Sequence, residues 1–122
     1  MRPQDHIRKA RRIEATVVGK LDPDKHYELC IEAYMLAGTH FLNAVLHKGS
    51  VTREDFDLSH TDRPVLQVPI DERLLPLFAA LKQIEDLRAG YLRGTDQWKP
   101  EDGRRCRESY EEVKRLAEKA FG

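Results

Sequence analysis

Residues 27–48, YELCIEAYMLAGTHFLNAVLHK, decide the fold of this chain. Apolar side chains recur there at steps of three and four residues, the spacing that places them on one face of a helix. The stripe consists of Tyr27, Cys30, Ile31, Tyr34, Phe41 and Val45, and it is widened by Leu29, Ala33 and Leu36. A helix that is apolar over so much of its circumference is buried on several sides. We therefore predict that this helix is the centre of the fold.

Three further helices are predicted around it, separated by proline and glycine. They run from about Asp5 to about Lys20, from about Asp71 to about Arg93, and from about Glu101 to about Phe121. The central helix is predicted to start at Asp22 and Pro23, because aspartate caps free N–H groups and proline fits the first helical position. Gly49 is predicted to end it.

These segments predict an all-α fold, an up-and-down four-helix bundle that forms a single domain over residues 1–122. The links between the first and second helices and between the third and fourth helices are short, which implies that the helices they join are antiparallel neighbours. The link from Gly49 to Ile70 is longer than such connections usually are. Thr52 and Asp55 fit a capping pattern, so this link is predicted to contain a short fifth helix.

The composition of the chain excludes an overall electrostatic attraction to nucleic acid or to an anionic membrane. It has 122 residues, with 21 basic and 21 acidic side chains. No apolar run approaches the ~20 residues needed to cross a bilayer, and the N-terminal residues lack the pattern of a secretory signal. We therefore expect a cytoplasmic protein without membrane contact or cofactor. Cys30 and Cys106 both fall on apolar helix faces, where reduced thiols act as small hydrophobic groups.

The long link holds the densest set of polar residues. His60 could exchange a proton near neutral pH, and Arg53 or Arg63 could hold a phosphate group. Arg53 and His60 are therefore the candidate catalytic pair of a metal-independent ribonuclease. The alternative is structural, because His60 to Pro64 is also a good loop-closing string in which short polar side chains bond nearby backbone.

His40 and His47 are candidate binding residues on the central helix. They lie two helical turns apart, so a rise of ~1.5 Å per residue separates them by ~10 Å. Only a pair one turn apart would be a strong sign of chelation. We therefore predict no metal site from this pair, and expect hydrogen-bonded histidines or a polar stripe at a dimer seam.

The first helix is basic, and Arg8, Arg11 and Arg12 are its candidate binding residues. Contacts from such a cluster to phosphates would give salt-dependent nucleic-acid binding. A solvated helix face is the alternative explanation of the same run. Trp98 could similarly stack on a base or cover one end of the bundle.

The central helix resembles the long second helix of HEPN domains, in which small and aromatic residues alternate before a short turn, here Gly49-Ser50-Val51-Thr52. Residues 109–117, SYEEVKRLA, are similar to that family's final helix. The resemblance implies a bundle of four or five helices that commonly dimerises. Family members serve as ribonuclease toxins, as partners of small nucleotidyltransferases or as RNA-associated modules. Catalytic members carry an arginine followed after four to six residues by a histidine, usually in the later helices. Only Arg53 and His60 fit that spacing here, and they lie in the link, which favours a non-catalytic member or a different function.

The sequence therefore predicts a non-catalytic HEPN-like module that binds a nucleotide, RNA or a protein partner such as a nucleotidyltransferase. The alternatives are a ribonuclease with Arg53 and His60 at a dimer seam, and a structural scaffold. A homodimer is expected, because three surrounding helices would hardly cover the central one and exposed apolar surface tends to be buried against a second copy.

Overall fold

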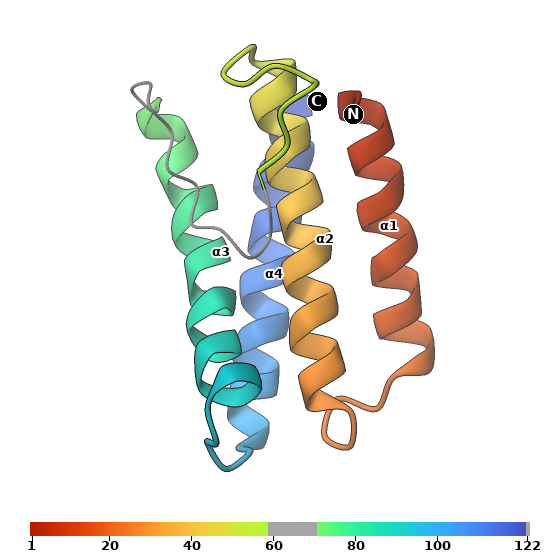
Figure 1. Cartoon of the computed structure of the whole chain (residues 1–122), viewed down its shortest axis with the longest axis vertical. Coiled ribbons are helices and arrows are strands. Elements are labelled where there is room, and N and C mark those ends of the chain that lie inside the picture. Colours follow the sequence, from red (N-terminus) through yellow and green to blue (C-terminus); the bar gives the residue numbers. More distant parts are fainter. Residues whose placement is uncertain (59–70, 122) are drawn as a thin grey trace.

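Four helices form an up-and-down bundle, as Figure 1 shows for a computed structural model that describes residues 1–58 and 71–121. The helices are α1 (Pro3–Lys20), α2 (Tyr27–Lys48), α3 (Leu75–Arg88) and α4 (Pro100–Phe121). A single 3-10 turn, Glu72–Leu74, leads into α3, and a π-helical turn, Ala89–Arg93, follows it. The described residues contain no strand, so the predicted all-α four-helix architecture is confirmed.

The central position predicted for α2 is also what the structure shows. It packs against α1, α3 and α4, and Phe41, Leu42 and Leu46 are at most 1% exposed. Gly38 allows the close approach of α3, because a Cβ atom there would lie 2.9 Å from Leu81 Cδ1. The other three helices thus cover most of α2, and the surface expected to drive dimerisation is smaller than predicted. Homodimerisation stays a prediction.

One predicted helix boundary and one predicted short helix differ from the structure. Asp22 does cap a turn, since its Oδ1 accepts hydrogen bonds from the N–H groups of Asp24 and Lys25 at 2.9 and 3.0 Å. However, α2 begins only at Tyr27, after that turn. The described part of the long link, residues 49–58, contains no helix. Thr52 does not cap a fifth helix there, because its hydroxyl lies against the ring of His47.

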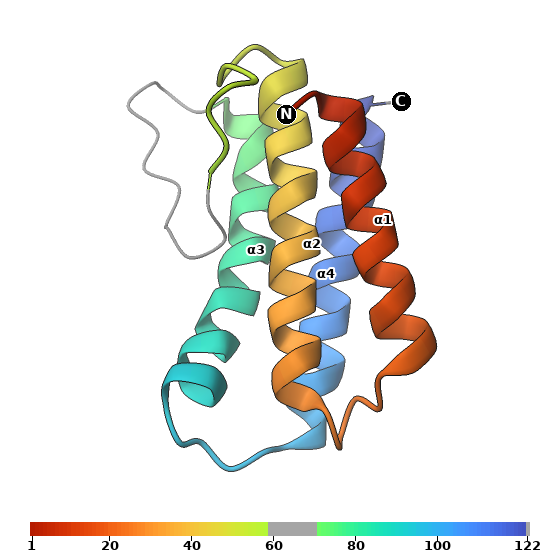
Figure 2. The ribbon, with the colours of Figure 1, turned by 45° about the vertical axis from the view of Figure 1, so that its right-hand side comes forward.

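The end of α2 determines where the following segment goes. Ser50 adopts a left-handed conformation with φ 57°, and the N–H of Val51 then bonds back to the carbonyl of Leu46 at 2.9 Å. This arrangement is a common way to satisfy the free carbonyls at a helix end. It turns the chain back along α2 (Figure 2), and Asp57 of this segment contacts His6 near the beginning of α1.

α2 is also, among the described residues, the one helix long and apolar enough to cross a membrane by length and composition. Its most apolar window is 72% buried inside the bundle. The core helix of a soluble protein meets the same criterion, so the cytoplasmic location stays a prediction.

Candidate functional site: a buried histidine and aspartate cluster

Three histidines and one aspartate meet where the beginning of α1 lies beside the end of α2. His6 comes from α1, His40 and His47 come from α2, and Asp57 comes from the segment after α2. The side chains of His6 and His47 are 1% and 0% exposed, whereas that of Asp57 is 40% exposed. The cluster is therefore buried on its histidine side and open to solvent on its aspartate side.

Asp57 joins the two buried rings. Its Oδ1 lies 2.8 Å from His6 Nε2 and 2.7 Å from His47 Nε2. On the far side of each ring, His6 Nδ1 lies 2.8 Å from His40 Nδ1, and His47 Nδ1 lies 2.8 Å from Thr52 Oγ1. Every ring nitrogen of His6 and His47 consequently has a partner.

The charges of the cluster determine where its protons are. Burial lowers the pKa of His6, which favours the neutral ring. Burial alone would raise the pKa of Asp57, but hydrogen bonds from His47 and His6 outweigh it and hold that pKa below its usual value. An ionised carboxylate only accepts hydrogen bonds, so both Nε2 atoms donate to it. A neutral His6 ring then accepts at Nδ1 from His40 Nδ1–H, while His47 Nδ1 is paired with the hydroxyl of Thr52.

His40 and His47 are two turns apart on α2, and the ring of His6 lies between them. Its ring centroid lies 5.1 Å from that of His40 and 5.2 Å from that of His47. A ring on the neighbouring helix thus sits between two rings that are two turns apart. His6 can do so because it belongs to the buried stripe of α1, together with Pro3, Ala10 and Val17.

Asn43 holds the segment that carries Asp57. The side chain of Asn43 is buried on α2, one turn before His47, and it pairs with the backbone of Leu58. Its Nδ2 donates to the Leu58 carbonyl at 2.9 Å, and its Oδ1 accepts from the Leu58 N–H at 2.8 Å. Two hydrogen bonds from one rigid helix therefore position the residue next to Asp57. The amino group of Met1 lies 3.7 Å from Asp57 Oδ1 and adds a positive charge on the open side.

The cluster has the donors and the spacing of a metal site. His6, His47 and Asp57 each offer one ligand atom, and these atoms all lie within 4.8 Å of one another. Two imidazole nitrogens with one carboxylate oxygen are a common set for zinc and for non-haem iron. His40 and Thr52 stand behind the two rings, where such sites usually have hydrogen-bond partners that orient the ligands.

The described residues include only one member of the predicted catalytic pair, Arg53. Arg53 is exposed and forms an ion pair with Asp55 at 3.0 Å, and it lies on an open hollow beside His47 and Thr52. His60 and Arg63 lie outside the described residues. The ribonuclease interpretation therefore stays a prediction, without geometric support from Arg53.

The candidate residues of α1 are exposed, but two of them have acidic partners. Arg8 pairs with Asp5 at 3.2 Å, and Arg11 lies 3.7 Å from Glu118 on α4. Arg12 is exposed on the same helix. Neighbouring acids thus offset part of the positive charge that suggested nucleic-acid binding.

Sequence reasoning selected His40 and His47 but missed His6 and the role of Asp57. The available signal for His6 was its place on the apolar stripe of α1, where a histidine needs a polar partner.

Comparison of the chain with family models, curated proteins and solved structures finds no match. The HEPN resemblance therefore stays a prediction, and the function must be argued from the site.

Proposed function

We propose that this chain is a metal-binding helical bundle that holds one divalent transition-metal ion through His6, His47 and Asp57. The observation that carries the proposal is the convergence of both Nε2 atoms on one carboxylate oxygen, at 2.8 and 2.7 Å. An ion that replaces the two shared protons would meet three donors already facing one another. Zinc is the best fit, because nitrogen and oxygen donors in this number suit it and it requires no change of oxidation state.

The partners behind the rings support this proposal. Metal binding through Nε2 requires each neutral ring to carry its proton on Nδ1 instead. Thr52 Oγ1 can accept a hydrogen bond from that proton, and so can His40 Nδ1 once His40 carries its own proton on Nε2. The same contacts that satisfy the metal-free rings therefore satisfy the metal-bound rings, with only a shift of tautomers.

Three protein ligands leave at least one coordination position open. Since both histidines are buried and Asp57 is the exposed ligand, the open position faces the solvent side of the cluster. A small molecule or water can complete the coordination there. The proposal concerns binding of the ion, and it assigns no reaction to the site.

The test is a zinc titration of purified protein from which metal has been removed with a chelator. We expect one ion per chain, and at least a hundredfold weaker binding in Asp57→Asn and in His47→Gln. Loss of a ligand removes one coordinate bond, whereas loss of a side chain that hydrogen-bonds to a ligand costs ten- to a hundredfold in affinity. His40→Gln should therefore fall between wild type and the ligand variants.

His26→Gln is the matched control, because His26 lies outside the cluster, where it accepts a hydrogen bond from the N–H of Asp22. It removes one histidine and should leave zinc affinity unchanged. Helical content and thermal melting in the presence of chelator establish that each variant is folded. Equal zinc affinity in wild type and Asp57→Asn would refute the proposal.

A further inference from the structure

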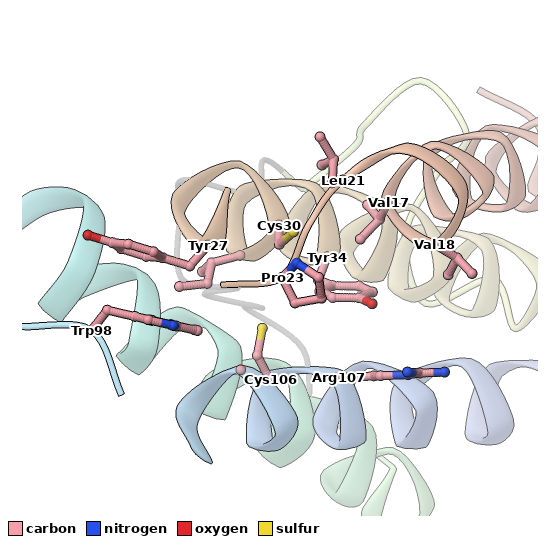
Figure 3. A pocket seen from close by; sticks show the side chains of 12 residues that line it. Val17, Val18, Leu21, Pro23, Tyr27, Cys30, Tyr34, Trp98, Cys106 and Arg107 are labelled. Carbon is pink, nitrogen blue, oxygen red and sulfur yellow. The ribbon is translucent and has the colours of Figure 1, made fainter. Parts of the chain in front are cut away.

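A second region suited to a ligand lies at the opposite end of the bundle. It is a pocket of about 140 Å³ between the end of α1, the beginning of α2 and the first turns of α4 (Figure 3). Val17, Leu21 and Ile31 contribute apolar surface to it, and the thiols of Cys30 and Cys106 face the same space. Its volume is close to the about 150 Å³ of an apolar cavity that binds benzene.

One wall of the pocket is aromatic and rigidly held. The rings of Tyr27 and Trp98 stack with centroids 4.4 Å apart and an interplanar angle of 9°. Trp98 Nε1 donates a hydrogen bond to Asp24 Oδ1 at 3.1 Å. Gly103 lets the indole approach α4, because a Cβ atom there would lie 2.9 Å from the ring. The wall is thus formed before any ligand arrives.

The two thiols make the pocket apolar rather than reactive. Burial raises the pKa of Cys30, and it raises the pKa of Cys106 to about 12. Both groups are therefore protonated at neutral pH, and the thiolate that attacks electrophiles is scarce. A ligand in this pocket binds without a covalent bond.

One edge of the pocket is polar. Arg107 and Tyr34 line it beside the exposed side chain of Val18, which is 62% exposed (Figure 3). Among the described residues, Arg107 forms no ion pair. A cation at the rim of an apolar pocket favours a ligand with an apolar body and an anionic group that reaches the rim.

We propose that this pocket binds a small monocyclic aromatic molecule that carries one anionic group. The ring lies between the Tyr27–Trp98 wall and the apolar side chains of α1 and α2. The anionic group lies at the rim, next to the guanidinium of Arg107. This site is separate from the histidine and aspartate cluster, and its test does not depend on a metal ion.

The probes are benzoate, benzyl alcohol and benzylamine, which share one ring and differ in charge. Trp98 is the single tryptophan of the chain, so intrinsic fluorescence reports directly on the pocket wall. Titrations are done with the full chain in chelator, which separates them from metal binding. We expect a saturable fluorescence change for benzoate, with affinity at least fivefold higher than for benzylamine and an intermediate value for benzyl alcohol.

Two variants locate the site. Val18→Phe places a bulky group at the rim from an exposed position, and it should weaken benzoate binding at least tenfold, whereas Val18→Ala should not. Arg107→Gln should remove the preference for benzoate over benzylamine and leave benzyl alcohol unaffected. The absence of saturable binding for all three compounds at millimolar concentration would overturn the proposal. Wild-type affinity for benzoate in Val18→Phe would overturn it as well.

Discussion

The two halves of α2 are both buried, but they are stabilised in different ways. The first half carries Tyr27, Cys30 and Ile31, which pack into the apolar core. The second half adds Asn43 and His47, which are also buried but have a hydrogen-bond partner for each side-chain nitrogen or oxygen. Burial of an apolar side chain stabilises a fold by itself. Burial of a polar side chain costs free energy, and its hydrogen bonds within the protein only offset that cost.

This difference distinguishes residues that stabilise the bundle from residues that we propose bind a ligand. A bundle could be stabilised by apolar residues along the whole length of α2. The second half also contributes apolar core residues such as Phe41 and Leu46, so its buried polar residues Asn43 and His47 carry a cost that packing alone does not explain. They lie where rings from α1 and α2 converge on the carboxylate of Asp57. Buried polar networks of this kind are expected at binding sites, where stability is exchanged for chemistry.

The largest change in stability is expected from a substitution at the apolar end of the bundle, around the first half of α2. Ile31 is 1% exposed, so Ile31→Ala leaves a cavity and should lower the free energy of unfolding by about 2–5 kcal/mol. Urea denaturation measures this loss. Zinc affinity should stay within twofold of wild type, because the cluster lies at the other end of the bundle. A loss of zinc binding in this variant, while it remains folded, would show that the two ends are not independent.

Asn43→Ala tests the polar end in the same way. It removes both hydrogen bonds to Leu58 and should cost about 1–3 kcal/mol, the usual penalty for an unpartnered buried group. Unlike Ile31→Ala, it should also weaken zinc binding at least tenfold, because the segment carrying Asp57 is no longer held. Denaturation and titration of the same sample check both effects. Unchanged zinc affinity would exclude Asn43 as a positioning residue.

Much of the fold could be predicted from the sequence, because helical periodicity depends on local spacing. The spacing of apolar residues predicts all four helices and the burial of α2. It does not reveal that residues 23–26 form a turn before α2, since proline after a capping aspartate fits a turn as well as a helix start. It also does not predict the π-helical turn after α3, which no residue pattern marks.

The site was less accessible to sequence reasoning. Antiparallel packing of α1 and α2 follows from their short link, and equal distances from that link place His6 level with His40. That pairing could have been found. The position of Asp57 could not, because it depends on the left-handed Ser50 and on the Asn43–Leu58 hydrogen bonds, which are tertiary features.

High pH should lower the stability of the protein through buried groups at the apolar end of the bundle. Burial raises the pKa of Cys106 and of Tyr34 to about 12, above their ordinary values of 9.0 and 10.0. The stability that depends on their protonated forms is fully present below about pH 9 and is lost as the pH rises through about 12. Urea midpoints between pH 8 and pH 11 should therefore fall. Cys106→Ala should show a smaller fall over this range, and an identical fall would contradict this assignment.

The weakest of the expected effects is the salt dependence of RNA binding to α1. Since Arg8 and Arg11 have acidic partners, Lys9 and Arg12 are the cations most available to phosphates. Two contacts to single-stranded RNA give a slope of about −1.4 in a plot of log affinity against log salt concentration. RNA binding measured across salt concentrations checks this value. A slope steeper than about −3 would mean that α1 uses its whole basic cluster.

The central claim is that the two rings and the carboxylate bind one ion together. X-ray absorption at the zinc edge of the zinc-loaded protein tests it most directly. We expect scattering from two imidazole rings and one carboxylate, with distances of about 2.0–2.1 Å from zinc to the imidazole nitrogens. A spectrum without imidazole scattering, or the same two-imidazole spectrum in His47→Gln as in wild type, would contradict the account.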